Sequence, residues 1–491
     1  MKTSPLFLAA ASALVLASCG CRVRVDCDPP DARILIDGQE LRSGSSVSLP
    51  SRAIKIQASR RGYKSLALTR RAKAIFGAEE IPLQLERESY DVVVELIPAS
   101  ASIGIDGSPL GTAPFKGRLD YGPHAAEASA IGKPKQAWSF EVTCPGQYVF
   151  RLQKEPSPAA RPLGVLPCGP APKQVAFAPD GGALFVSLLS GDGFDVIDLS
   201  SRAASRVSVP GYGKDQGFVE GIFPAGTSTF LVSQMSRDAI HEFALSAGAA
   251  PRYLRSMNSY GDWTKVIAYE PKTRRLAASN WISDDVTILD YDGGRLIERL
   301  EGLPTPRGLA WSPDGSHLYI ASYGGGGLFR FDGSGWRQDG HLSRPGSALR
   351  HLVLDASGST LYVSDMMNRE AIEVDAATLS IKRIFRTGSN PNTIALSPDG
   401  RILAVSCRGP NNPLGYIERS REPGEVLLFD LGSGELVASI EGGAQPTGLD
   451  ISRDGRLLAF SNFQDANVEL YDISALERAA ATEASARRPG F

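Results

Sequence analysis

Apolar and polar positions alternate with a period of two through much of the chain, as in strands with one buried face. Residues 23–27 and 53–57 alternate in this way, and Asp-Gly and proline turns lie between such segments. Residues 92–115 repeat the succession of a strand, a proline turn and an Ile-Asp-Gly hairpin. Period-two segments divided by turn residues are typical of small antiparallel β-domains. We expect two such domains, over residues 19–88 and 89–153.

The rest of the chain carries a repeated unit. Residues 173–181 read KQVAFAPDG and residues 307–315 read RGLAWSPDG, and related copies follow. The turn of the unit recurs at Gly181, Gly226, Thr273, Gly315, Gly358, Gly400 and Gly455. Successive turns are 42 to 55 residues apart, and most units continue to a strand that ends in aspartate. Seven repeats of this length, each with several strands, predict a seven-bladed β-propeller.

The ends of the repeat region indicate how the ring closes. Residues 163–169 precede the first unit as a similar segment precedes the last, and the last unit has no such strand after Ile473. We therefore expect the N-terminal strand to complete the seventh blade and to remove an open sheet edge. The propeller is predicted over residues 164–474, after a proline-rich linker over 154–163 and before a tail over 475–491.

The N-terminus has a different pattern. Lys2 precedes an apolar run over residues 6–17 that is too short to span a bilayer, and Cys19 follows. Such a run predicts a signal-peptide core. The Leu-Ala-Ser before Cys19 resembles the lipobox of bacterial lipoproteins. The resemblance implies that residues 1–18 are a signal peptide and that acyl chains on Cys19 hold the protein at a membrane. The alternative is an ordinary secretory signal followed by a chance cysteine.

Two further resemblances concern the folded regions. The N-terminal β-domains resemble PEGA domains through the Pro-x-x-Ala turn at Pro98, the Ile-Asp-Gly hairpin at Ile105 and the Gly62-Tyr63 pair. The repeats over residues 165–473 resemble YVTN or YncE-like propellers. Together they imply an all-β fold in which two small PEGA-like β-sandwich domains precede a seven-bladed β-propeller. They identify no reaction, because propellers host many unrelated activities.

Composition excludes some function classes. The chain has 52 Lys and Arg against 54 Asp and Glu, a net charge of −2. A nucleic-acid partner is not expected, because such binding usually requires a basic excess. No segment after the N-terminus is apolar enough to span a membrane. The remaining cysteines, Cys21, Cys27, Cys144, Cys168 and Cys407, have no CxxC spacing that would predict zinc or redox chemistry, and disulfide pairing stays open.

Aligning the repeats places one residue of each unit at the mouth of the central channel. The first two strands of a blade are antiparallel, so the start of the first and the end of the second share one face. The residues at the start are Lys173, Phe218, Lys265, Arg307, Arg350, Asn392 and Thr447, with Glu220 as the alternative to Phe218. Clustered cations in a concave mouth would attract anions. The alternative is that these residues are simply solvated.

A second aligned position follows the second strand. It holds Leu189, Met235, Trp281, Tyr323, Met366, Arg408 and Phe463. Large side chains on loops favour recognition, although each could instead pack between blades. The long spacing in the sixth unit comes from an insertion over residues 409–418 that enlarges a loop of the same face. The predicted ligand-binding residues are Lys173, Lys265, Trp281, Arg307, Tyr323, Arg350, His351, Met366, Asn392, Arg408, Asn411 and Asn412.

Catalytic patterns are scarce. The five histidines are scattered, and no HExxH, Gly-x-Ser-x-Gly, Walker or EF-hand motif occurs. We therefore expect no catalytic residue, metal or cofactor. The prediction is a lipid-anchored binding or scaffolding protein of the cell envelope that recognises an envelope protein, peptide, glycan or anionic ligand through the mouth. The alternatives are a lactonase or other hydrolase at the same mouth, where Glu220 and His351 lie, and a purely structural envelope protein.

Overall fold

The computed structural model describes residues 21–50, 53–73, 77–99, 101–152, 157–213 and 216–476. Residues 1–18, the predicted lipidation residue Cys19 and most of the predicted tail lie outside the described residues. Strands form nearly all regular structure within these ranges, as the all-β fold class predicts. No helix found there has the length and apolar character needed to cross a membrane. Among the described residues, Cys27, Cys144, Cys168 and Cys407 form no disulfide.

The chain divides into two compact units, of which the first holds most of the N-terminal sheets. The first set of strands is β1 (Cys21–Asp28), β2 (Arg33–Ile36), β3 (Gln39–Leu41), β4 (Ser45–Leu49), β5 (Ala53–Ser59), β6 (Leu66–Arg71) and β7 (Ala78–Gln84). The second set is β8 (Ser89–Ile97), β9 (Ser102–Ile105), β10 (Ser108–Thr112), β11 (Phe115–Asp120), β12 (Gly122–Ala130), β13 (Lys133–Val142) and β14 (Gly146–Arg151).

The two sets share one topology. Sheets in the order β4-β1-β7 and β3-β2-β5-β6 recur as β11-β8-β14 and β10-β9-β12-β13. In the first set, alternate residues of the strands point into one core, so that Ile34, Ile36, Ile54 and Ile56 are fully buried. The period-two pattern of the sequence thus marks the buried faces of two successive copies of one small β-topology.

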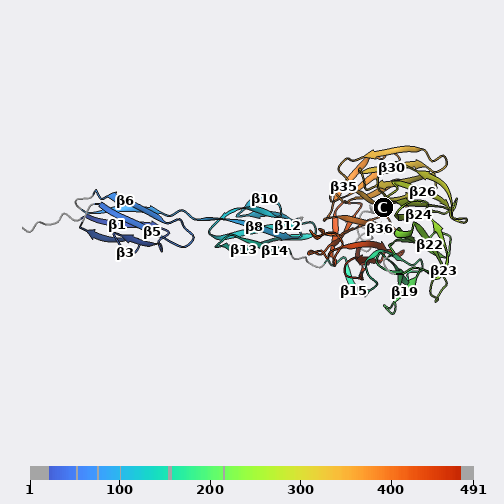
Figure 1. Cartoon of the computed structure of the whole chain (residues 1–491), viewed down its shortest axis with the longest axis horizontal. Coiled ribbons are helices and arrows are strands. Elements are labelled where there is room, and N and C mark those ends of the chain that lie inside the picture. The colour runs from blue at the N-terminus through green and yellow to red at the C-terminus, as the bar shows by residue number, and fades with distance from the viewer. Residues whose placement is uncertain are drawn as a thin grey trace, which may run out of the picture. The chain divides into compact units, whose positions relative to one another are not determined.

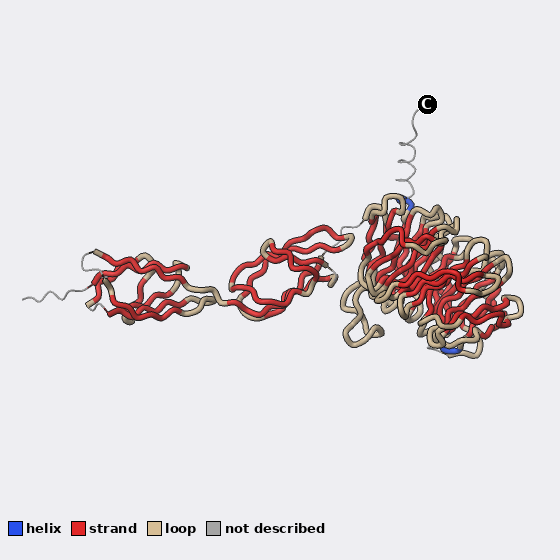
Figure 2. The backbone as a smooth tube through the Cα atoms, turned by 90° about the horizontal axis from the view of Figure 1, so that it is seen from above, coloured by secondary structure: helices blue, strands red, loops and turns tan. Residues whose placement is uncertain are grey.

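The second unit contains seven four-stranded antiparallel sheets, the blades of the propeller (Figures 1 and 2). Blades 1 to 3 contain β16 (Pro172–Phe177), β17 (Ala183–Leu188), β18 (Gly193–Asp198) and β19 (Ala204–Ser208); β20 (Phe218–Ile222), β21 (Thr229–Gln234), β22 (Ala239–Ala244) and β23 (Arg252–Asn258); and β24 (Thr264–Glu270), β25 (Arg275–Asn280), β26 (Asp285–Asp290) and β27 (Arg295–Leu300). Blades 4 and 5 contain β28 (Pro306–Trp311), β29 (His317–Ser322), β30 (Gly327–Asp332) and β31 (Gln338–Ser343); and β32 (Leu349–Leu354), β33 (Thr360–Asp365), β34 (Glu370–Asp375) and β35 (Ile381–Arg386). Blades 6 and 7 contain β36 (Pro391–Leu396), β37 (Ile402–Cys407), β38 (Glu425–Asp430) and β39 (Leu436–Glu441); and β40 (Pro446–Ile451), β41 (Leu457–Asn462), β42 (Asn467–Asp472) and β15 (Arg161–Pro167).

The first strand of each blade is the innermost, and these strands contact one another around the ring, with β40 of blade 7 against β16 of blade 1. The ring closes as the sequence predicts, because β15 pairs antiparallel with β42 and completes blade 7. Blade 7 therefore combines the first and last strands of the propeller and leaves no unpaired partner strand at the seam.

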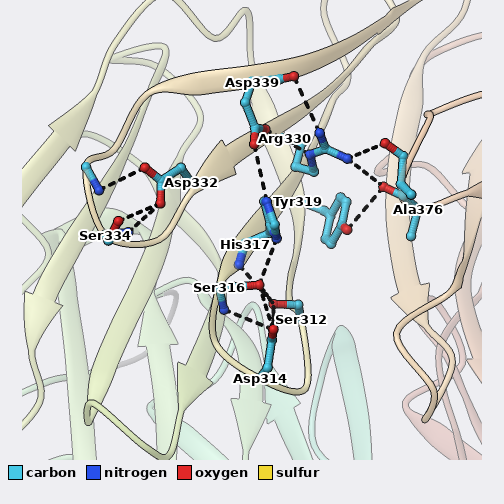
Figure 3. A network of polar contacts seen from close by, with 12 residues as sticks. Ser312, Asp314, Ser316, His317, Tyr319, Arg330, Asp332, Ser334, Asp339 and Ala376 are labelled. Atoms are coloured by element: carbon cyan, nitrogen blue, oxygen red, sulfur yellow. Dashed lines mark hydrogen bonds and ion pairs between the residues drawn. The ribbon is translucent and has the colours of Figure 1, made fainter.

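Arginine side chains also join neighbouring blades. Arg330 of blade 4 donates from Nε to Asp339 at 2.8 Å and from Nη1 to the Ala376 carbonyl of blade 5 at 3.0 Å (Figure 3). Arg255 of blade 2 donates in the same way to the Tyr291 carbonyl of blade 3, and Arg383 of blade 5 donates to the Leu431 carbonyl of blade 6. These charge-assisted hydrogen bonds fix the rotation of one blade relative to the next.

Candidate functional site

All seven inner strands begin at one face of the ring, which we call the mouth face. Each second-position residue donates its backbone N–H to the carbonyl just ahead of its own inner strand, as Trp281 does to Trp263 and Arg408 to Asn390. The same bond occurs from Leu189, Met235, Tyr323, Met366 and Phe463. Both aligned positions of the sequence therefore lie on the mouth face.

A β-bulge at the start of each inner strand leaves the mouth residue outside the regular pairing of the sheet. In blade 4 the ladder runs from Pro306 opposite Ser322 to Gly308 opposite Ala321, so Arg307 has no partner residue. Equivalent irregularities surround Lys173, Lys265 and Arg350. A bulge re-aims the side chain of its extra residue. The side chains of the repeated cations thus turn away from their sheets at the same position of each inner strand.

A ring of buried serines fixes these bulges. The Val266 N–H donates to Ser279 Oγ at 3.0 Å, and that hydroxyl donates to the Arg307 carbonyl of the next blade, also at 3.0 Å. Ser233 reaches the Lys265 carbonyl in the same way, at 2.7 Å. The sequence carries a signal for this ring, because the fifth residue of the second strand is serine at 187, 233, 279, 364, 406 and 461, and alanine at 321. Lys265, Arg307, Asn392 and Thr447 are thus each held by a serine of the preceding blade, whereas Arg350 faces Ala321 and the Ser187 hydroxyl has no partner among the described residues.

The mouth face encloses a cavity of about 530 Å³, which we call the mouth cavity. Nine of the twelve predicted ligand-binding residues line it: Lys173, Lys265, Trp281, Arg307, Tyr323, Arg350, Met366, Arg408 and Asn411. The further lining residues are Leu189, Met235, Trp263, Met367, Asn390 and Tyr416. Trp263 and Asn390 stand two residues before the aligned mouth position, where extending the repeat alignment would have found them. Tyr416 belongs to the insertion and has no counterpart in other blades.

Three predicted residues lie outside the lining. Asn392 is fully buried, and its two side-chain polar atoms have no partner in the described part of the chain. His351 directly follows the mouth residue Arg350 in β32 and is half-buried. Asn412 shapes the inserted loop: its side chain donates to the Arg419 carbonyl and accepts from the Leu414 N–H, at 2.8 and 2.9 Å.

The alignment of blade 2 was wrong by one residue. Phe218 pairs with Gln234 as Thr264 pairs with Asn280, so the mouth position of blade 2 belongs to Val219 and not to Phe218. Glu220 is then the counterpart of Val266 and His351. The error arose because the divergent unit lacks the proline that begins most inner strands, and a one-residue slip exchanges the two faces of a strand.

Five basic side chains meet in the mouth cavity. Lys173, Lys265, Arg307, Arg350 and Arg408 line it, while no aspartate or glutamate does. Within the described ranges none of the five makes an ion pair, although Arg307 and Arg350 are each only 7% exposed. Burial, and then the guanidinium groups of Arg307 and Arg350, lower the pKa of Lys265 to about 6. The pKa of Lys173 is also lowered, by burial and by the neighbouring cations.

Aromatic rings support these cations. Lys265 Nζ lies 4.8 Å from the ring centre of Trp263 and 5.6 Å from that of Trp281. The Arg307 guanidinium lies 5.7 Å from the Trp281 ring centre, and Arg408 lies 5.6 Å from that of Tyr416. Cation–π contacts stabilise positive charge without neutralising it. The cavity therefore keeps a positive potential for an incoming group.

Two carboxyl groups of the inner strands have altered acidity. Burial raises the pKa of Glu220 to about 7, against the opposing charges of Arg307 and Arg350. Burial also raises the pKa of Asp450 to about 7, although it accepts a hydrogen bond from the Phe177 N–H at 2.8 Å. Burial lowers the pKa of His351 to about 3, so this imidazole is neutral at physiological pH. Glu220 is thus an acid-base group close to the cations of the mouth.

Other arrangements of chemically active residues do not form a site. No group of three or more His, Cys, Asp or Glu side chains in the described ranges is placed to hold a metal ion. Ser316, His317 and Asp339 contact one another in order, at 2.8 and 3.2 Å (Figure 3). However, the Ser316 hydroxyl and backbone N–H both donate to the carboxylate of Asp314, which lies in the turn between β28 and β29. These contacts stabilise a turn on the face away from the mouth.

Comparisons with known proteins agree with this fold. A family model described as a lactonase with a seven-bladed β-propeller matches residues 327–485. Antigen Lp49 of Leptospira interrogans is 36% identical over 309 residues, which cover 61% of this chain and 67% of the antigen. A chain in the crystal structure of a mitotic checkpoint complex superposes with a TM-score of 0.54 at 15% identity, covering 64% of this chain and 91% of that one. This last likeness concerns the fold alone.

Proposed function

This chain belongs to the same family as antigen Lp49, and from this premise we propose that it is a binding protein whose mouth cavity captures an anionic group of an envelope or extracellular partner. The observation that carries the proposal is the set of five cations that line one concave cavity without a carboxylate. Charge clustered in a concave surface with low-dielectric walls concentrates its field on a ligand.

Clustering these buried basic groups has an energetic cost. Burying an unpaired charge is unfavourable, and like charges placed together add to that cost. Lys265 and Arg307 are nevertheless held in place by aromatic rings and by bulges that serines of neighbouring blades fix. A purely structural propeller would have no use for such an arrangement. An anionic ligand would supply the missing counter-charge and recover the cost on binding.

The N-terminal region supports a proposal about location. We propose that Cys19 is the lipid anchor and that the β-domains over 19–88 and 89–153 are PEGA-like spacers between a membrane and the propeller over 164–474. The lipobox-like sequence and the two copies of one β-topology support this. The protein would then act at the cell envelope. Mass spectrometry of the membrane fraction tests it, since Cys19 should carry acyl chains and C19A should abolish them.

Binding of a permanent anion tests the proposed function. Pyrenetetrasulfonate keeps its charge over the accessible pH range and reports binding by fluorescence. We expect R307Q/R350Q to weaken the affinity of the protein for this dye by at least about tenfold, because the two arginines that would contact the anion are buried. R401Q is the matched control, since Arg401 pairs with Asp430 on the opposite face. Equal affinity of the R307Q/R350Q protein and wild type would refute the proposal.

A second function is favoured by two observations. The first is the match of residues 327–485 to a lactonase family model. The second is the raised pKa of Glu220 beside Arg307 and Arg350, because hydrolysis of an anionic lactone would need a general base near groups that bind the anion. A panel of lactones and esters with purified protein tests this alternative. Turnover that is lost in E220Q, with H351A as the comparison, would establish it. No turnover with any substrate, together with anion binding, favours the binding role.

A further inference from the structure

Exposed apolar side chains gather around the mouth cavity. Among the most exposed large apolar residues in the described ranges are Leu414 at 84%, Ile417 at 74% and Met367 at 66%. Trp263, Ile282 and Tyr416 are also exposed and also lie on loops of the mouth face. We call these six residues the apolar rim. Apolar groups clustered next to a polar cavity typically mark an interaction surface.

The inserted loop of blade 6 is held in place by its backbone. Gln445 Nε2 donates to the Tyr416 carbonyl at 2.9 Å, and Gln464 Nε2 donates to the carbonyls of Tyr416 and Ile417 at 3.0 and 3.2 Å. Arg419 forms an ion pair with Asp465 of blade 7. The backbone polar groups are thus satisfied from blade 7, while the side chains of Leu414 and Ile417 face solvent. The loop presents them in a preorganised position, which lowers the entropic cost of binding.

The chemistry of the lining distinguishes between classes of ligand. A neutral glycan would need acceptor groups for its hydroxyls, and the cavity offers cations, the amides of Asn390 and Asn411, and no carboxylate. Met235, Met366 and Met367 add flexible, polarizable side chains of the kind found at peptide-binding surfaces. Carboxylates suit the buried guanidinium groups, and aliphatic or aromatic side chains suit the rim. A polypeptide can carry both in adjacent residues.

We propose that the partner of the mouth is a polypeptide segment in which two or more acidic residues adjoin a large apolar residue. The carboxylates enter the mouth cavity and contact Arg307, Arg350 and Lys265, while the apolar side chain packs on Leu414 and Ile417. This inference rests on the proposed function and specifies its ligand. The cavity volume of about 530 Å³ suits a few side chains of a segment, so the remainder of the partner lies outside it.

Fluorescence polarisation with three designed peptides tests the inference. One peptide carries glutamates beside leucine and phenylalanine, a second replaces the apolar residues by serine, and a third replaces the glutamates by glutamine. We expect the full chain to bind the first at least about tenfold more tightly than either other peptide. L414S/I417S should reduce the preference over the serine-substituted peptide to about twofold or less and keep the preference over the glutamine-substituted peptide. I297S/I384S, which changes exposed apolar residues of the outer strands β27 and β35, should leave the preference unchanged.

The outcomes separate this inference from the proposed function. Binding of pyrenetetrasulfonate without preference for the acidic and apolar peptide would overturn the inference and leave anion capture intact. If neither the dye nor any peptide binds, both fail. Vesicles of anionic phospholipid provide the competing test. Binding to vesicles that is lost in L414S/I417S, with no peptide bound, would mean that the rim contacts lipid and would also overturn the inference.

Discussion

Acidification should strengthen anion binding at the mouth. The ordinary pKa of lysine is 10.5, and burial with the charges of Arg307 and Arg350 lowers that of Lys265 to about 6. At pH 8 the Lys265 amine is therefore almost entirely neutral. A bound anion favours the ammonium form, so binding takes up a proton. Linkage then gives an affinity that rises by up to about tenfold for each unit of pH between 8 and 6, or about 1.4 kcal/mol per unit.

Glu220 acts in the same direction. Its pKa is raised to about 7, so lowering the pH removes a negative charge next to Arg307 and Arg350. The two groups can be separated, because K265R keeps a permanent charge and E220Q removes the titrating carboxyl. Fluorescence titration with pyrenetetrasulfonate from pH 8 to 6 should give a rising affinity for the wild type and a smaller rise for K265R/E220Q, in which Lys173 is the lysine of the lining whose lowered pKa remains. An affinity that is flat or falls on acidification of the wild type would refute the reasoning.

The remaining predictions concern stability. S279A should lower the free energy of unfolding by about 1 to 3 kcal/mol in urea, because the Val266 N–H and the Arg307 carbonyl both lose their partner, whereas S246A on the surface should change it little. R330Q should lower the melting temperature and the free energy of unfolding, the latter by about 2 kcal/mol, because it removes the hydrogen bond from blade 4 to the Ala376 carbonyl. An unchanged melting temperature would mean that this hydrogen bond does not contribute to stability. Deletion of residues 161–167 should expose β42 and give aggregated protein in size-exclusion chromatography, and a monomeric, stable product would contradict the role of β15 in closure.

The sequence predicts the propeller well because its repeats share a demanding turn. Gly315 and Gly400 adopt positive φ angles of +73° and +71°, which glycine tolerates and most residues avoid. This requirement preserves the Pro-Asp-Gly pattern and hence the count of blades. The mouth cations could be predicted for the same reason: Lys173 and Arg307 occupy one repeat position, and a ring brings equal positions together.

The site was less predictable where length or register varies. Asn392 shares its repeat position with Arg350, but its short amide ends in the buried layer and does not line the cavity. Tyr416 lies in an insertion, so no aligned residue predicts its contact with Arg408. Phe218 was misplaced because its divergent unit lacks the proline that marks the start of most inner strands. These features depend on side-chain reach and on local backbone irregularity, which a repeat alignment does not contain.

The closure of blade 7 has a consequence for the order of folding. Arg161 pairs with Asp472, more than 300 residues later, so the ring cannot close until residue 472 has left the ribosome. Contacts of such long sequence separation form slowly, because a large loss of chain entropy precedes them. Blades 1 to 6 can form their local hairpins while synthesis continues, but the cations of the mouth converge only when the last blade joins. An unfinished or truncated chain would therefore bind no anion, and its binding activity reports that the ring is complete.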